Sequence, residues 1–133
     1  MNDFTNILRE HNLKATPQRL AMMDSIFLHG HINIDKLYLE VKEKFSSVSL
    51  ATIYKNINAM TKNMLLSEVK LPNEKSVFEI VKEYHSHLLC NSCGEVTDVE
   101  INTQDMVNEL SSKYDFTIEQ SDLVLSGLCK NCK

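Results

Sequence analysis

Two Cys-X-X-Cys pairs place the strongest constraint on how this 133-residue chain can fold. The pairs are Cys90-Asn-Ser-Cys93 and Cys129-Lys-Asn-Cys132. Each pair spans a tight turn that can direct two sulfur atoms at one ion, and two pairs complete a tetrahedral sulfur shell suited to Zn²⁺. A shell with no open position is structural, so the sequence predicts that zinc ties the last residues of the chain to the region around Cys90.

The compartment bears on what the cysteines do. The N-terminal stretch MNDFTNILREHNLK has no apolar core of signal-peptide length, and no apolar run approaches membrane-spanning length. We therefore expect a cytoplasmic protein that has no membrane partner. Thiols stay reduced there, which disfavours disulfides. A redox dithiol and exposed thiols without a joint role are the alternatives, and the matched spacing favours zinc over both.

Charge divides the chain into two parts. Residues 1–69 carry eight Lys and Arg against seven Asp and Glu, whereas residues 70–133 carry six against eleven. This asymmetry indicates two domains with different roles. We place the first domain at residues 1–82 and the second at residues 83–133, with a hinge at about residues 79–84.

Helical periodicity dominates the first part. It predicts a helix around Phe4–Leu8, a second helix capped by Thr16 and ended near Gly30, a third over Ile34–Phe45, and a fourth that begins at Ser49. The apolar positions that define the faces of the last three helices are Leu20, Met23, Phe27, Leu37, Val41, Phe45, Leu50, Ile53, Ile57, Met60 and Met64.

A hairpin is predicted after the helices. Residues 65–71 and 76–81 suit strands, and Pro72-Asn73-Glu74-Lys75 suits the turn between them. This order of elements is that of a winged helix-turn-helix, and a small helical bundle is the alternative. No acidic residue occurs from Phe45 to Ser67, so phosphate can approach the fourth helix without local repulsion.

The second part changes its period. Leu88–Leu89, Val96–Ile101 and Phe116–Leu128 are predicted as strands. Asp105–Tyr114 is predicted as a helix that Thr103 caps. The second part is therefore expected to be a compact α+β unit.

A second candidate metal site begins at His85 and His87. Residues two apart on a strand share one face, and Cys90 falls on the other parity, so the histidines separate from the cysteines. A nitrogen and oxygen site suits Fe, Mn, Ni, Co or Zn. Chance polar placement is the alternative, and a solvated loop position is the default interpretation of His31. The residues that could complete the site are Asp98, Glu79 and His31.

Four motifs give the chain a wider resemblance. They are LKATPQR at Leu13–Arg19, GHINIDKLY at Gly30–Tyr38, SLATIYKNIN at Ser49–Asn58 and HSHLLCNSCGEVTDV at His85–Val99. Together with the closing Cys-X-X-Cys, they resemble the ferric uptake regulator family of bacterial metalloregulators. The resemblance implies an α+β protein with an N-terminal winged helix-turn-helix domain, a hinge and a small C-terminal α/β dimerisation domain.

The resemblance also implies residue roles. Structural Zn²⁺ is expected at Cys90, Cys93, Cys129 and Cys132, and a regulatory Fe²⁺ or Mn²⁺ at His31, Glu79, His85, His87 and Asp98. Lys14, Arg19, Tyr54 and Lys55 fall at or beside positions that face DNA in the family, and Thr52 shares the polar face of the fourth helix. The implied function is a metal-dependent repressor that binds double-stranded operator DNA as a homodimer and has no small-molecule substrate.

Within the family, Asp98 and the run SLATIYKNIN resemble the peroxide-responsive branch. In that branch, ferrous iron reacts with hydrogen peroxide and a ligand histidine is oxidised. Glu79 stands where the best-known peroxide sensors have Asp, and an iron, zinc or nickel uptake regulator is the alternative. Ser86 and the histidine-free segment 120–122 predict that the additional metal site of some members is not intact.

Enzymatic activity is not expected. The His-Glu-X-X-His motif of zinc hydrolases is absent from the sequence. The zinc deaminase signature requires Glu two residues after its His, and no histidine of the sequence has Glu at that position. A zinc-stabilised protein-interaction module is a further alternative, and it predicts no metal-dependent binding of duplex DNA.

Overall fold

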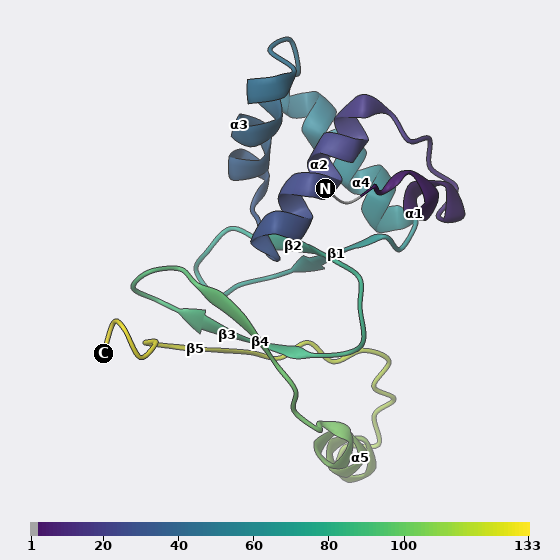
Figure 1. The fold of residues 1–133 in the computed structure, drawn as a ribbon. Coiled ribbons are helices and arrows are strands. Elements are labelled where there is room, and N and C mark those ends of the chain that lie inside the picture. The colour runs from purple at the N-terminus through teal and green to yellow at the C-terminus, as the bar shows by residue number, and fades with distance from the viewer. Residues whose placement is uncertain (1–2) are drawn as a thin grey trace. The chain divides into compact units, whose positions relative to one another are not determined.

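The computed structural model of the chain describes residues 3–133. The chain divides into two compact units, Met1–Lys82 and Glu83–Lys133. Over the described residues, the first unit has four helices followed by two strands, and the second has three strands and one helix (Figure 1). The predicted α+β class is therefore confirmed.

The helices of the first unit begin at the capping residues that the sequence predicts. The helices are α1 (Thr5–Glu10), α2 (Pro17–His29), α3 (Ile34–Lys44) and α4 (Leu50–Lys62). The Thr16 hydroxyl accepts a bond from the backbone N–H of Arg19 at 3.3 Å, and Ser49 accepts one from Thr52 at 3.1 Å. Gly30 ends α2 at φ +75°, a conformation that side chains with a Cβ disfavour.

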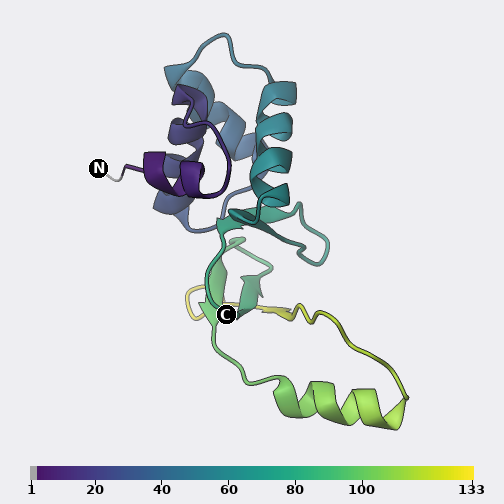
Figure 2. The same cartoon turned by 90° about the vertical axis from the view of Figure 1, so that its right-hand side faces the viewer.

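The core of the first unit lies among these helices, which Figure 2 shows gathered around one another. Fully buried side chains come from each helix, among them Leu8, Met22, Leu37 and Ile57. Their removal from water provides the main driving force for folding of this unit.

Three positions on the predicted apolar faces are exposed, and one of them is Leu50, the first residue of α4, at 37%. Phe27 is 57% exposed, because α2 buries Met22, Met23 and Ile26, while the Phe27 ring lies at the rim of the core, 5.8 Å from that of Phe4. Met64 is 69% exposed, because α4 ends at Lys62 and Met64 lies in the following turn at φ +65°.

The predicted hairpin forms with shorter strands than expected. β1 (Leu66–Val69) pairs antiparallel with β2 (Val77–Ile80), and Asn73 turns the chain at φ +58°. A bridge between Ile32 and Phe78 joins the hairpin to the loop between α2 and α3. Helices followed by this hairpin make the first unit a winged helix-turn-helix, as the sequence predicts.

The second unit is a three-stranded sheet in the order β4-β3-β5. Its elements are β3 (Ser86–Cys90), β4 (Val96–Val99), α5 (Gln104–Lys113) and β5 (Val124–Gly127). β3 pairs antiparallel with β4 and parallel with β5, so the chain crosses over through α5. Both views show α5 standing apart from the three strands (Figures 1 and 2).

Two expectations for this unit are wrong in detail. The strand predicted over Phe116–Leu128 forms only at Val124–Gly127, where β3 offers a hydrogen-bonding partner, and the earlier residues run back from the end of α5. Thr103 is the N-cap residue of α5, but its side chain makes no capping bond, because its backbone lacks the extended conformation of Thr16 and Ser49. The Asn102 side chain accepts a bond from Gln104 N–H at 3.0 Å. Across residues 3–133, no helix is long and apolar enough to span a membrane.

Candidate metal centres

The parallel pairing of β3 with β5 brings the two cysteine pairs together. Cys90 ends β3 and lies opposite Gly127, the last residue of β5, so Cys129 follows two residues beyond that pairing. The turn after β3 closes through Gly94, whose backbone N–H donates to the Cys90 carbonyl at 2.9 Å and whose φ is +78°. The second turn closes through Cys132, whose N–H donates to the Cys129 carbonyl at 3.0 Å.

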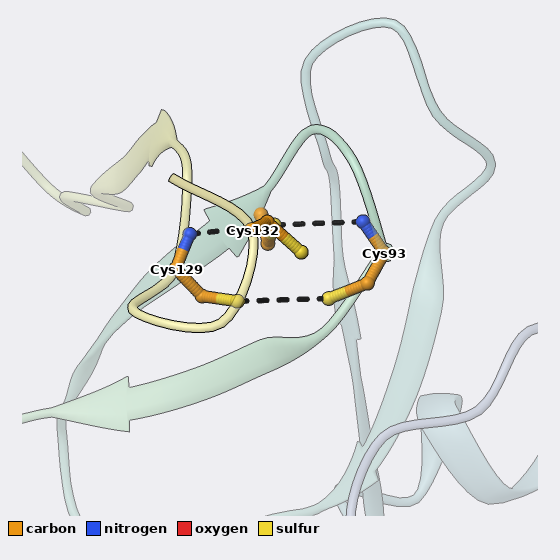
Figure 3. A group of neighbouring side chains, drawn as sticks. Cys93, Cys129 and Cys132 are labelled. Atoms are coloured by element: carbon orange, nitrogen blue, oxygen red, sulfur yellow. Dashed lines mark hydrogen bonds between the residues drawn. The ribbon is translucent and has the colours of Figure 1, made fainter.

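The four sulfur atoms form one group. Each offers its Sγ within 4.8 Å of the others, and no disulfide joins them. The Sγ atoms of Cys93 and Cys129 lie 3.9 Å apart, and Figure 3 shows them facing each other. Four sulfurs at about 2.3 Å from one Zn²⁺ in a tetrahedron lie about 3.8 Å from one another. The group therefore has the size that a four-sulfur zinc site requires.

Backbone hydrogen bonds lower the pKa of the Cys90 thiol. The N–H groups of Cys93 and Cys129 point at Cys90 Sγ over 3.5 and 3.4 Å, and they lower the pKa of Cys90 to about 6. By contrast, the neighbouring Cys129 thiol raises the pKa of Cys132 to about 12. A divalent ion bound to the four sulfur atoms would favour deprotonation of the thiols. The donor set fits zinc.

A second cluster lies on the histidine side of β3. His87 pairs with Asp98 of β4 in the strand register, and its Nε2 lies 3.3 Å from Asp98 Oδ1. His85 Nε2 lies 3.4 Å from the same oxygen, and the two imidazole centroids are 4.6 Å apart. Three donor atoms therefore converge within the second unit, in a nitrogen and oxygen set that suits Fe²⁺, Mn²⁺ or Zn²⁺.

The backbone orients one of these rings. His85 Nδ1 lies 2.8 Å from the carbonyl oxygen of Glu83, and a carbonyl can only accept, so Nδ1 carries the proton. The Nε2 lone pair then points toward Asp98, ready to bind a cation. The sequence pattern did not reveal this supporting carbonyl, because backbone acceptors leave no signature in residue types.

The first unit holds two further donors. His31 Nε2 lies 2.9 Å from Glu79 Oε2, and Glu79 is only 4% exposed. His31 follows Gly30 at the end of α2, while Glu79 follows Phe78 on β2. The bridge between Ile32 and Phe78, with N–H to O distances of 3.2 and 2.8 Å, holds the two donors side by side. His31 is therefore not the solvated loop residue of the default interpretation.

The residues predicted to face DNA all lie in the first unit. Tyr54 and Lys55 are exposed on α4, and Lys14 is exposed in the segment before α2. The Thr52 hydroxyl lies 2.9 Å from that of Ser49, within the cap of α4. Arg19 is partly buried, and its guanidinium bonds to neighbouring segments of the same unit.

Hydroxyl groups lie around Ser86 and segment 120–122, where the sequence predicts that the additional metal site is not intact. The Tyr84 hydroxyl lies 3.2 Å from Ser121 Oγ, and hydrogen bonds from Ser121 and Thr103 hold the pKa of Tyr84 below its ordinary value. Ser86 is fully buried on β3. Neutral hydroxyls are weaker ligands for transition metals than imidazole and carboxylate groups. The absence of a third metal site stays a prediction.

Comparisons with known proteins agree on one family. The family model described as the ferric uptake regulator family matches residues 10–126. The chain is 30% identical over 128 residues to the peroxide-responsive repressor of Staphylococcus epidermidis. The aligned region covers 95% of this chain and 85% of the relative. Among solved structures, the Campylobacter jejuni peroxide stress regulator is 33% identical with a TM-score of 0.72, over 98% of this chain and 100% of that chain. The Vibrio cholerae ferric uptake regulator is 27% identical with a TM-score of 0.77, over 96% of this chain and 100% of that chain.

Proposed function

Because the chain belongs to the ferric uptake regulator family, we propose that it is a metal-dependent repressor that binds operator DNA as a homodimer. Its named relatives are repressors and regulators rather than enzymes, in agreement with the prediction that this chain is not an enzyme. Operator DNA is the proposed partner, so the proposed place of action is the cytoplasm.

The winged helix supports the DNA-binding part of the proposal. α4 presents an exposed face with Tyr54, Lys55 and Lys62, and the segment 45–67 that contains it has no acidic residue. A helix of this kind fits the major groove, and its lysines attract phosphate. We assign base and phosphate contacts to Tyr54, Lys55 and Thr52, with Lys14 reaching the backbone from the segment before α2.

The second unit supports the homodimer. It leaves large apolar side chains exposed on its strands, on α5 and in the segments that follow them, including Leu88, Leu125, Leu128, Met106, Leu110 and Phe116. α5 contains no buried residue. A soluble unit that exposes this many apolar groups gains stability when a second copy covers them, and a two-fold pair is the commonest arrangement.

The pattern of donors carries the regulatory part of the proposal. A nitrogen and carboxylate pair, His31 and Glu79, belongs to the first unit, and the cluster of His85, His87 and Asp98 belongs to the second. We propose that one regulatory Fe²⁺ or Mn²⁺ takes ligands from both sets, while Zn²⁺ occupies the four cysteines. An ion shared in this way would hold the two units in one relation, and it would favour the form of the dimer that binds DNA.

Anaerobic titration tests the function. The zinc-loaded protein is titrated with Fe(II), Mn(II) and Zn(II) in the presence of a duplex selected from a random-sequence library by the manganese-loaded protein. We expect operator affinity to rise by about 100-fold or more with Fe(II) or Mn(II), a coupling free energy at the upper end of the usual range. Equal affinity with and without added metal would show that the chain is a zinc-stabilised binding module rather than a metal-dependent repressor.

We propose further that the regulatory site senses hydrogen peroxide. Ferrous iron held by these residues would supply the one-electron chemistry that cleaves peroxide. His85 would bind the ion through Nε2, because the Glu83 carbonyl accepts the hydrogen bond from its Nδ1–H. The net change converts one imidazole C–H to C–OH and yields water as the second product. His31, whose Nε2 lies 2.9 Å from Glu79 Oε2, is the other proposed target of oxidation.

Mass spectrometry of peptides tests peroxide sensing. After one equivalent of peroxide, the iron-loaded protein is expected to carry one added oxygen on His31 or His85 and to release operator DNA. The manganese-loaded protein is the control, and it should stay unmodified because Mn²⁺ is a poorer one-electron reductant. Oxidation confined to Cys or Met residues would contradict peroxide sensing and support a second function, an iron, zinc or nickel uptake regulator. Glu79, where the best-known peroxide sensors have Asp, is the observation that favours this second function.

A further inference from the structure

The guanidinium of Arg19 joins three segments of the first unit. Its Nε donates to Asn56 Oδ1 on α4 at 3.0 Å, and its Nη1 donates to the carbonyl oxygen of Lys14 at 3.1 Å. Asn56 in turn donates from Nδ2 to the Thr52 carbonyl at 3.0 Å. A single side chain at the start of α2 is therefore bonded both to α4 and to the segment that carries Lys14.

Both ends of this connection are oriented by further bonds. The backbone N–H of Arg19 is bonded to the Thr16 hydroxyl at 3.3 Å, which fixes the residue in the first turn of α2. The Asn56 amide uses its oxygen for Arg19 and its nitrogen for Thr52, so the amide is held in one orientation. The guanidinium is planar and presents its N–H groups in a rigid fork, so two bonds of this kind define its plane.

The acceptors are neutral, which separates this arrangement from an ordinary ion pair. An amide oxygen and a backbone carbonyl accept the two bonds described for Arg19. Bonds from a charged donor to neutral acceptors are directional, and they leave the positive charge of Arg19 in place. Asn56 is partly buried on α4, between Lys55, which is exposed, and Ile57, which is buried.

We propose that Arg19 and Asn56 are a positioning pair, which holds α4 and the Lys14 segment in the relation that operator binding requires. Arg19 then acts on DNA through Asn56 and Lys14 rather than by contacting a phosphate itself. The inference rests on the proposed DNA-binding function, and it adds Asn56 as a residue that neither the sequence pattern nor the resemblance assigns.

The competing role for Arg19 is a direct phosphate contact. Two of the five N–H groups of its guanidinium make the bonds described above, and the others can reach outward. The two roles predict different results for variants that keep the charge. A phosphate contact tolerates Arg19→Lys and is indifferent to Asn56→Ala. A positioning pair is broken by both, because one ammonium cannot bond Asn56 and the Lys14 carbonyl in the geometry of the fork.

The experiment measures affinity for the operator and for an unrelated duplex, using full-length zinc- and manganese-loaded protein. We expect Asn56→Ala and Arg19→Lys each to weaken operator binding by about tenfold, the scale of one lost link between oriented elements. Affinity for the unrelated duplex should stay at the wild-type value, because non-specific attraction to phosphate depends on charge, which neither variant alters. The double variant should bind the operator no more weakly than Arg19→Lys alone, since both changes remove the link between α2 and α4.

Asn63→Ala is the matched control. The Asn63 amide donates to the Ala59 carbonyl at 2.7 Å, as the Asn56 amide does to Thr52, but it lies at the far end of α4 and has no bond to Arg19. Asn63→Ala should leave the operator affinity unchanged. Thermal unfolding of each variant shows whether the first unit stays folded, and Arg19→Lys decides the outcome if Asn56→Ala melts early.

Two results would overturn the positioning role. One is wild-type operator affinity for both Asn56→Ala and Arg19→Lys, with Arg19→Ala lowering the salt dependence by about one phosphate contact. The other is equal loss in Asn56→Ala and Asn63→Ala, which would show a general weakening of α4. Failure of the proposed function looks different, because wild-type protein would then bind the operator no better than the unrelated duplex.

Discussion

Cys132→Ser is expected to remove zinc and unfold the second unit. This unit buries few side chains of its own, and the four cysteines tie the end of β5 to the end of β3. A hydroxyl is a poor ligand for zinc at neutral pH, so the change leaves three sulfurs where a closed site needs four. Metal binding and folding are the same event in small zinc-dependent units, so losing one should remove the other.

Three measurements check this expectation. Zinc content by elemental analysis should fall from about one ion per chain to none, consistent with a single closed structural site. Size-exclusion chromatography should show loss of the dimer, and far-UV circular dichroism should show loss of strand signal. Lys130→Ala is the matched control, because it changes an exposed residue between two cysteine ligands without removing a donor. A folded dimer without zinc in the Cys132→Ser protein would show that the cysteine group is not structural.

Asp98→Asn is expected to abolish the response to regulatory metal while leaving zinc bound. Asp98 Oδ1 lies within 3.4 Å of His85 Nε2 and 3.3 Å of His87 Nε2, so it is the carboxylate around which the cluster in the second unit converges. Asparagine keeps the shape of the side chain but loses the negative charge that attracts a divalent ion. Affinity for Mn(II) should fall by about 100-fold, the upper end of the losses seen when groups around a metal are changed.

Metal titration followed by calorimetry and by operator binding measures this effect. Asp105→Asn provides the control, since Asp105 is an exposed carboxylate in the first turn of α5 and should not influence Mn(II) affinity. Zinc content should be the same in wild type and both variants. Unchanged Mn(II) affinity in Asp98→Asn would exclude this residue from the regulatory site, whereas loss of zinc as well would mean that the change disturbed the sheet.

Local signals in the sequence were enough to place the helices. Thr16-Pro17 and Ser49 cap the ends of α2 and α4 because capping depends on a hydroxyl within reach of the N–H groups of the next turn. The strands were harder, since a strand exists only where a partner is available. Phe116–Leu128 has the composition of a strand throughout, but only Val124–Gly127 pairs with β3.

The candidate sites likewise have features that local spacing predicts and features that depend on residues far apart in the sequence. The cysteine spacing predicted the group that the structure shows, because two residues between cysteines define a turn locally and two such turns are easily matched. Strand parity also separated the histidines from Cys90. Strand parity could not predict the contact between His31 and Glu79, because that contact depends on the bridge between Ile32 and Phe78. It also gave no indication of the bond between Arg19 and Asn56, whose residues lie 37 positions apart.

The sequence by itself therefore determined where α2 and α4 begin, the α+β class, the family and the chemical types of the metal donors. Each of these follows from properties of neighbouring residues, which spacing and side-chain chemistry express directly. Only the tertiary structure decided which oxygen His85 and His87 share, how the Glu83 carbonyl sets the tautomer of His85, and that Arg19 links α2 to α4. These features depend on where the folded backbone places distant groups in space, and no local pattern encodes that placement.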